Sequence, residues 1–201
     1  MKKLILSLIG VSLVAIGAAQ AAVSPQTIEN LNAAFQGESN AAHRYAAFAT
    51  KADAEGHSYA ARLFRAAAKA ETIHRDTHKK AILKLGGTIK DFKLDEVNVG
   101  TTAENLQAAI KGESYERDTM YPEFLKLAKL DGAKPAIRTF IYAQKAEEGH
   151  AKLYQDALDN LGKNVDRPVY VCRECGYTIT ESPTKNCASC RESASKFELI
   201  K

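Results

Sequence analysis

The sequence predicts a mainly α-helical protein, in which a four-helix bundle is followed by a small metal-binding β domain. Three observations predict this fold class. Four long stretches carry apolar residues at helical spacing, one long non-helical connection divides them into two pairs, and two Cys-x-x-Cys pairs lie near the end of the chain. A length of 201 residues is enough for one well-formed core and a small appendage.

Residues 1–21 are expected to be a secretory signal peptide. They begin with two lysines after Met1, continue with an apolar run from Leu4 to about Ala19, and end on the small residues Ala19 and Ala21. This layout is typical of export signals and predicts cleavage after Ala21 and a periplasmic mature protein. The alternative is a membrane anchor formed by an uncleaved leader, although the run is somewhat short for a membrane-spanning helix.

The bundle is expected to occupy residues 22–164. Its helices are predicted at residues 25–55, 58–85, 102–131 and 134–161. Ser24 and Pro25 suit the N-cap and the first turn of the first helix, and a glycine follows each predicted helix end. Residues 88–101 lack helical periodicity and are interpreted as a long crossover. Four long helices with one long connection in the middle predict a ferritin-like bundle.

The charge of the chain argues against nucleic acid as a partner. The formal net charge is +4, and removal of Lys2 and Lys3 with the leader leaves 26 basic and 24 acidic residues. Domains that bind nucleic acid carry a stronger and more clustered basic excess. We therefore expect no nucleic-acid partner.

An internal repeat relates the two halves of the bundle. NLNAAFQGES (30–39) matches NLQAAIKGES (105–114) at an offset of 75 residues, and AETIH (70–74) matches AEEGH (146–150) at an offset of 76. The repeat pairs Glu38 with Glu113, Glu71 with Glu147, and His74 with His150. Each half thus supplies one glutamate from its first helix and a Glu-x-x-His motif from its second helix, where positions i and i+3 share a face.

These six residues predict a dinuclear metal site. Burial of several carboxylates in an alanine-rich bundle is costly unless cations compensate their charge. Oxygen and imidazole ligands suit iron and manganese and can also hold zinc. A single glutamate on such a helix is usually a solvated surface residue, but six matched positions favour a shared metal target. Glu116, three residues after Glu113, offers a fifth carboxylate, and its alternative is a surface charge near Arg117.

Residues 165–201 are expected to form the second, cysteine-based domain. Cys172 and Cys175 form one pair, Cys187 and Cys190 the other, and eleven residues separate the pairs. Four thiolates at this spacing predict a tetrahedral site for iron or zinc. So small a tail needs the metal to fold well. A pair of disulfides is the alternative, because the protein is expected to be exported.

Several stretches together resemble the rubrerythrin family. They are AFQGESNAAHRYAAFA, LFRAAAKAETIH, GESYERDTMYPEF and AEEGHAKLY, followed by the Cys-x-x-Cys tail. The resemblance covers residues 25–201 and implies a ferritin-like bundle with a non-haem di-iron site, joined to a rubredoxin-like iron centre. The tail departs from the usual pattern, because Ala188 replaces a proline, no glycine follows Cys190, and no tryptophan precedes the first cysteine pair. These departures weaken the choice of iron over zinc in the tail.

The resemblance also implies roles for individual residues. Carried over by position, the di-iron ligands are Glu38, Glu71, Glu113, Glu116, Glu147 and His150. Glu71 and Glu147 are expected to bridge the metals, and His74 and Glu113 to exchange at one iron between the reduced and oxidised states. Tyr45 and Tyr121 match tyrosines beside the cluster, which makes Glu113, His74, Tyr45 and Tyr121 the expected catalytic residues.

A physical argument supports the position of Tyr45. Tyr45 lies seven residues after Glu38, so both side chains point the same way, and a buried phenol needs a partner such as a ligand carboxylate. A core aromatic with its hydroxyl elsewhere is the alternative. His43, His57 and His78 have no place in the motif and are interpreted as surface or boundary residues.

The function implied by the resemblance is reduction of hydrogen peroxide to water, in defence against oxidative stress. Electrons would reach the di-iron site through the tail iron, and zinc is the alternative metal for the four-cysteine site. In a single chain the two centres are expected to lie far apart, so a head-to-tail homodimer or higher oligomer is expected. Outside the cytoplasm, a c-type cytochrome or a rubredoxin-like carrier is the expected electron donor.

Two other functions are carried as alternatives. The first is a ferroxidase or iron-handling protein, which shares the ferritin-like bundle but needs no centre that returns electrons. The second is a non-enzymatic metal-binding redox module with zinc in the tail. Turnover of peroxide with an added reductant distinguishes the first alternative, and metal content with a visible spectrum distinguishes the second.

Overall fold

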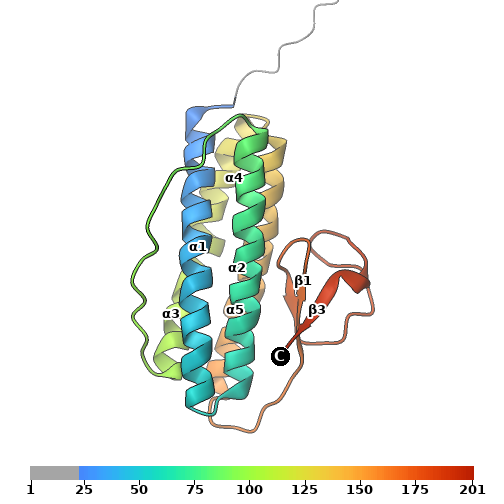
Figure 1. The fold of residues 1–201 in the computed structure, drawn as a ribbon. Helices are drawn as coiled ribbons and strands as arrows, with labels where there is room; N and C mark the ends of the chain where they lie inside the picture. Colours follow the sequence, from blue (N-terminus) through green and yellow to red (C-terminus); the bar gives the residue numbers. More distant parts are fainter. Residues whose placement is uncertain (1–22) are drawn as a thin grey trace, which may run out of the picture.

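The protein is described by a computed structural model that covers residues 23–201, and the predicted leader lies outside these residues. Four rows of helix form a bundle, and a small β domain packs against its side (Figure 1). The helices are α1 (Pro25–Ala54), α2 (Ser58–Lys84), α3 (Thr102–Tyr115), α4 (Tyr121–Leu130) and α5 (Lys134–Asp159). None of the helices in this part of the chain is long and apolar enough to cross a membrane.

The first helix begins where the sequence predicts. The Ser24 side chain accepts a hydrogen bond from the Thr27 N–H, and Pro25 occupies the first turn. The Ser24 and Thr27 hydroxyls also donate to Asp131 Oδ2, at 2.5 and 2.6 Å, which ties the start of α1 to the end of α4. The second half of the bundle begins with a capping box, in which Thr101 and Glu104 satisfy each other's backbone N–H groups.

The third row of the bundle is interrupted, so the prediction of one helix over residues 102–131 is wrong in this detail. A π-helical segment, Glu116–Met120, joins α3 to α4. The repeat explains it: Glu113 follows Glu38 by 75 residues, whereas Tyr121 follows Tyr45 by 76. One extra residue therefore lies between Glu113 and Tyr121, and a π-helical turn absorbs it without ending the row.

The long crossover is held against α1 by two asparagines. Residues 88–101 contain no helix or strand and run along the bundle in Figure 1. The Asn32 side-chain oxygen Oδ1 accepts from the Lys90 N–H at 2.8 Å. The Asn40 amide donates to Asp95 Oδ2 at 2.6 Å and its oxygen accepts from the Asp95 N–H at 3.1 Å. The connection is thus ordered by side chains rather than by secondary structure of its own.

The β domain is a three-stranded antiparallel sheet in the order β2-β1-β3. Its strands are β1 (Val169–Cys172), β2 (Thr178–Ile179) and β3 (Phe197–Ile200), and a 3₁₀ turn over Ala194–Lys196 precedes the last strand. Val169 and Val171 of β1 are fully buried and join the core of the bundle. Lys69 of α2 also pairs with Glu198 at 2.6 Å. Burial of these apolar side chains is therefore the main stabilising contact between the sheet and the bundle, and the partly exposed ion pair contributes less.

The two cysteine pairs fold into matching turns. Gly176 N–H donates to Cys172 O, and Arg191 N–H donates to Cys187 O, both at 2.9 Å. The residue after each pair is left-handed, with φ of 76° at Gly176 and 68° at Arg191. The sequence departure after Cys190 therefore leaves the turn unchanged, at a strain of about 1 kcal/mol or more for a residue with a side chain.

Two apolar clusters fill the two ends of the bundle. One contains Phe48, Phe64 and Tyr154 together with Tyr45. The other contains Leu31, Leu125, Phe140 and Tyr121, among others. Alanines occupy many of the buried positions on α1, α2 and α5, so the helices approach closely. Because Tyr45 and Tyr121 each bond to a buried glutamate, the carboxylates lie between the two clusters.

Candidate metal centres

The structure brings the six repeat-related residues together in the middle of the bundle. Each is at most 2% exposed. Their ligand atoms form two groups, and within each group all atoms lie within 4.8 Å of one another. One group is Glu38, Glu71, His74 and Glu147, and the other is Glu71, Glu113, Glu147 and His150. Glu71 and Glu147 belong to both groups, which is the arrangement expected of carboxylates that bridge two metals.

The two histidines face the carboxylates through the same ring nitrogen. His74 Nδ1 lies 2.7 Å from Glu71 Oε2 and 3.3 Å from Glu147 Oε1. His150 Nδ1 lies 3.0 Å from Glu147 Oε2 and 3.3 Å from oxygens of Glu71 and Glu113. The helical i, i+3 spacing places each histidine beside the glutamate of its own motif, and the bundle brings the two motifs face to face.

The chemistry of these atoms fits metal ions. Buried polar atoms are normally hydrogen-bonded, and an unpaired one costs about 1–3 kcal/mol. Within residues 23–201, six such atoms at this site have no hydrogen-bond partner. They are Glu38 Oε2, Glu71 Oε1, Glu113 Oε2, both carboxylate oxygens of Glu147, and His150 Nδ1. Two divalent cations would satisfy them and offset the negative charge, so the cluster is a ligand set for a dinuclear metal site.

The carboxylate pKa values express the same need for cations. Burial raises the pKa of Glu38 and Glu147 well above the ordinary value, and the charges of Glu116 and Glu71 respectively raise them further. Burial also raises the pKa of Glu71, but the nearby His150 and His74 outweigh it and bring that pKa to about 2. A divalent cation would lower the pKa of Glu38 and Glu147, as the histidines lower the pKa of Glu71.

The two tyrosines bond across the bundle. The Tyr45 hydroxyl donates to Glu113 Oε1, and the Tyr121 hydroxyl donates to Glu38 Oε1. Burial raises the pKa of both phenols well above 10, and the partner carboxylates raise it further. Each tyrosine is therefore a neutral donor. Tyr45 meets the glutamate of the other half rather than Glu38 of its own helix, which helical spacing alone did not distinguish.

Glu116 lies outside both ligand groups. Its side chain is half-buried, and among the neighbouring charges it raises the pKa of Glu38 the most. Burial and the charges of Glu113 and Glu71 in turn raise the pKa of Glu116, so the spare carboxylate interacts with members of both groups. Glu113 belongs to the group that contains His150, and the exchange of His74 and Glu113 at one iron stays a prediction. The role of Glu116 as a ligand stays a prediction.

The four cysteines form a second candidate centre in the tail. All four are free thiols, and all four sulfurs lie within 4.8 Å of one another. The Cys172 and Cys190 sulfurs are 3.7 Å apart, and those of Cys175 and Cys187 are 3.6 Å apart. A disulfide would need about 2.05 Å, whereas a tetrahedron with metal–sulfur bonds of about 2.3 Å has edges of about 3.8 Å. The geometry fits one tetrahedral metal and contradicts the disulfide alternative.

The two centres touch within one chain, so the expectation of a large separation in the monomer is wrong. His74 Nε2 lies 3.1 Å from the carbonyl oxygen of Cys175, and His150 Nε2 lies 3.0 Å from Thr178 Oγ1. Residues 175–178 of the tail thereby contact both histidines on the side away from the carboxylates. A Cβ at Gly176 would lie 2.3 Å from His74 Nε2, so the glycine permits this close approach.

His78 corrects another prediction, because it is buried rather than a surface or boundary residue. Its side chain is fully inaccessible and lies between Tyr121 and Phe140. His78 Nε2 lies 3.1 Å from the Tyr121 hydroxyl, and Nδ1 lies 3.0 Å from Thr139 Oγ1. The i, i+4 spacing from His74 was the available signal, since it puts both on one helix face. His43 is exposed and His57 is half-buried, as expected.

Comparison with known proteins finds relatives that match most of this chain. A sequence model described as Rubrerythrin matches residues 29–158. Rubrerythrin-2 of Clostridium acetobutylicum is 35% identical over 180 residues, which cover 87% of this chain and 96% of that protein. Nigerythrin of Nitratidesulfovibrio vulgaris is 32% identical over 164 residues, or 82% of this chain and 81% of that one.

Solved structures show the same fold. The fully reduced, all-ferrous state of nigerythrin superimposes with a TM-score of 0.82 at 30% sequence identity, over 91% of both chains. The match therefore includes most of the tail as well as the bundle.

Proposed function

The chain belongs to the rubrerythrin family of di-iron proteins with a rubredoxin-like domain. From this premise we propose that it is a peroxidase that reduces hydrogen peroxide to water. The reaction consumes one peroxide, two electrons and two protons and yields two waters. The assignment of peroxide as the substrate is our proposal.

One observation carries this proposal above the others. A cluster of buried carboxylates and histidines with unpaired ligand atoms lies in direct contact with a four-cysteine centre of the same chain. A protein that only stores iron needs the first centre but not the second. A site that must be re-reduced after each turnover needs both.

The protein side chains supply position and charge. Irons bound in the bundle would supply two electrons and polarise the bound peroxide. Glu71 and Glu147 hold both metal positions together, because each lies in both ligand groups. Tyr45 and Tyr121 orient Glu113 and Glu38 through hydrogen bonds and remain protonated, which places two proton donors at the site.

Electrons would return through the contact between the tail and His74. The hydrogen bond from His74 Nε2 to the Cys175 carbonyl oxygen joins a ligand of one centre to a ligand residue of the other. An imidazole held in this way is also fixed in orientation toward its metal. We propose that this contact serves electron return, in the single chain or between the subunits of a homodimer.

The donor, the oligomer and the cellular location belong to the same proposal. A c-type cytochrome or a rubredoxin-like carrier would reduce the tail in the periplasm. Recovery of the protein outside the cytoplasm with an N-terminus near Ala22 would support export, whereas a full-length chain embedded in membrane would replace it with anchoring.

The central test uses the purified protein with two bundle irons and one tail metal, reduced and mixed with peroxide. We expect one rapid oxidation for each equivalent of peroxide and continued consumption when an electron donor is added. Iron deposition by the chain without peroxide turnover would favour the ferroxidase alternative. A tail that contains zinc and shows no ferric thiolate absorption would favour the non-enzymatic module.

A further inference from the structure

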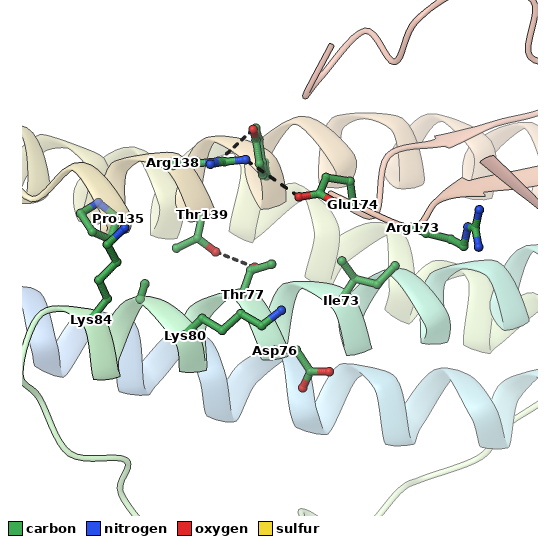
Figure 2. Close-up of a pocket in the computed structure, with 12 residues that line it drawn as sticks. Ile73, Asp76, Thr77, Lys80, Lys84, Pro135, Arg138, Thr139, Arg173 and Glu174 are labelled. Carbon is green, nitrogen blue, oxygen red and sulfur yellow. Dashed lines mark hydrogen bonds and ion pairs between the residues drawn. The ribbon is translucent and has the colours of Figure 1, made fainter. Parts of the chain in front are cut away.

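A pocket of about 420 Å³ opens on the face of the bundle between α2 and α5. Figure 2 shows Thr77 and Thr139 facing each other across its floor, with Lys80, Lys84 and Arg138 around them. Arg173 and Glu174, between the first two cysteines, complete one side. The pocket lies outside the ligand cluster, and the function proposed above does not use it.

A chain of hydrogen-bonding groups connects this pocket to the ligand cluster. Thr77 Oγ1 lies 2.6 Å from Thr139 Oγ1, and Thr139 Oγ1 lies 3.0 Å from His78 Nδ1. His78 Nε2 lies 3.1 Å from the Tyr121 hydroxyl, which donates to Glu38. Every gap is within hydrogen-bond distance. Thr77 is half-buried at the pocket, whereas the other members are buried, so the chain leads from the surface to the centre of the bundle.

The order of donors along this chain follows from its inner end. Because the Tyr121 hydrogen points to Glu38, the Tyr121 oxygen accepts from His78, which must carry its proton on Nε2. His78 Nδ1 then accepts from the Thr139 hydroxyl, and Thr139 accepts from Thr77. The single Thr77 hydroxyl proton also has the His74 carbonyl oxygen within reach at 2.9 Å, and the relay uses the shorter 2.6 Å contact with Thr139. A neutral ring of this tautomer accepts at Nδ1 while it donates at Nε2, which is what the two contacts require.

We propose that Thr77, Thr139 and His78 form a proton relay from the pocket to Tyr121 and the carboxylate cluster. In one passage Tyr121 gives its proton to Glu38 and takes the proton of His78 Nε2. His78 Nδ1 takes the Thr139 proton, Thr139 takes the Thr77 proton, and Thr77 takes one from a water in the pocket, which becomes hydroxide and leaves to the solvent. One proton enters and one neutralises Glu38, while Thr77, Thr139, His78 and Tyr121 stay neutral and the His78 proton moves from Nε2 to Nδ1. The relay rests on the proposed function, since peroxide reduction consumes protons at this site.

The repeat supplies an internal comparison for this assignment. Residues 76 positions away in the other half are Leu153 for Thr77, Tyr154 for His78 and Leu63 for Thr139. The ligands are kept in both halves, but Leu153 and Leu63 have no hydrogen-bonding side-chain group, and the Tyr154 hydroxyl has no hydrogen-bond partner among the described residues. A requirement of the metal site itself would apply to both halves. Thr77, His78 and Thr139 therefore serve a role that only their half has, which is the link to the pocket.

The test measures proton movement without turnover. The full chain is loaded with Zn²⁺ so that NMR lines stay narrow, and exchange of the His78 ring proton with D₂O is followed in ¹⁵N-histidine-labelled protein. We expect Thr139→Val to slow this exchange by about 10-fold or more, and Thr139→Ser to restore it. Thr72→Val is the matched control, because the Thr72 hydroxyl bonds only to Ala68 of its own helix. Equal exchange rates in Thr139→Val and the wild type would overturn the relay.

A second measurement uses the iron-loaded chain. Steady-state peroxide consumption should fall about 10-fold in Thr139→Val and recover in Thr139→Ser. Unchanged consumption in Thr139→Val would overturn the relay as a route for catalytic protons. A wild type that consumes no peroxide would refute the proposed function, and the exchange experiment would still decide whether the relay exists.

Discussion

The two ends of the metal site have the same ligands but different surroundings. At one end Tyr121 lies beside His78, and a hydrogen-bonded chain leads to a surface pocket. At the other end Tyr45 packs among Phe48, Phe64 and Tyr154, with ring centroids 5.7–6.2 Å away. The ligands had to stay matched to hold two metals, whereas the residues behind them were free to diverge. The difference gives a duplicated site one polar side and one apolar side.

The apolar end also carries an unsatisfied group. The Tyr154 hydroxyl, at the position equivalent to His78, is buried without a hydrogen-bond partner among the described residues. A buried hydroxyl left in this state costs about 1–3 kcal/mol. Tyr154 therefore has no hydrogen-bond partners like those of His78. Tyr45 can orient Glu113, but no hydrogen-bonded chain among the described residues leads from it to the pocket.

The largest expected effect comes from the residues that both ends share. Glu71→Ala or Glu147→Ala should abolish peroxide reduction and lower bundle iron, since each removes a carboxylate that belongs to both ligand groups. The loss should exceed about 100-fold, because even loss of a group behind a ligand costs roughly 10- to 100-fold. Iron content and steady-state consumption are measured, with the exposed neighbour Glu148→Ala as control. Wild-type turnover with two irons bound would show the ligand assignment to be wrong.

The next largest effect is expected from loss of the four-cysteine site in the tail. Cys172→Ser combined with Cys187→Ser should disrupt the four-sulfur site and end sustained turnover, because the thiolates that carry returning electrons are lost. The bundle ligands contain no cysteine, so a pre-reduced bundle should still undergo one rapid oxidation. Stopped-flow oxidation and steady-state consumption are compared on the same variant, with helix content as a check of folding. Undiminished steady-state turnover would give the tail metal a structural role only.

The comparison itself is tested by removing one hydroxyl from each end. Tyr121→Phe breaks the link between His78 and Glu38 and should slow steady-state peroxide consumption by about 10-fold or more. Tyr45→Phe removes only the hydrogen bond to Glu113 and should slow it several-fold less. Consumption rates at matched iron content decide the order. Equal losses in the two variants would mean that the polar surroundings of Tyr121 give it no special role.

The smallest effect is expected at the apolar end. Tyr154→Phe deletes a hydroxyl that has no partner among the described residues, so activity should be unchanged and the free energy of unfolding should rise by up to about 1 kcal/mol. Chemical denaturation of the metal-loaded chain measures the change. A clear loss of stability would show that the hydroxyl is bonded, and the contrast between the two ends would then be smaller than proposed.

Helical spacing and repetition were sufficient to predict the ferritin-like bundle and the residues that meet at its centre. A Glu-x-x-His motif presents both side chains on one face wherever the helix lies, and the repeat identified which motifs belong together. The extra residue in the third row is also visible as the change of offset from 75 to 76, although the apolar periodicity predicts one helix over this stretch. A single insertion has no effect on apolar periodicity strong enough to reveal a π-helical turn.

The sequence by itself therefore determined the ligand types, their pairing across the repeat and the four-cysteine site, because these depend on spacing along the chain. Only the tertiary structure decided that Tyr45 bonds to Glu113, that His78 is buried and linked to a pocket, and that the tail contacts His74 and His150. Each of these contacts joins residues from different elements. Their partners are chosen by how helices and sheet pack against one another, and no local period encodes that packing.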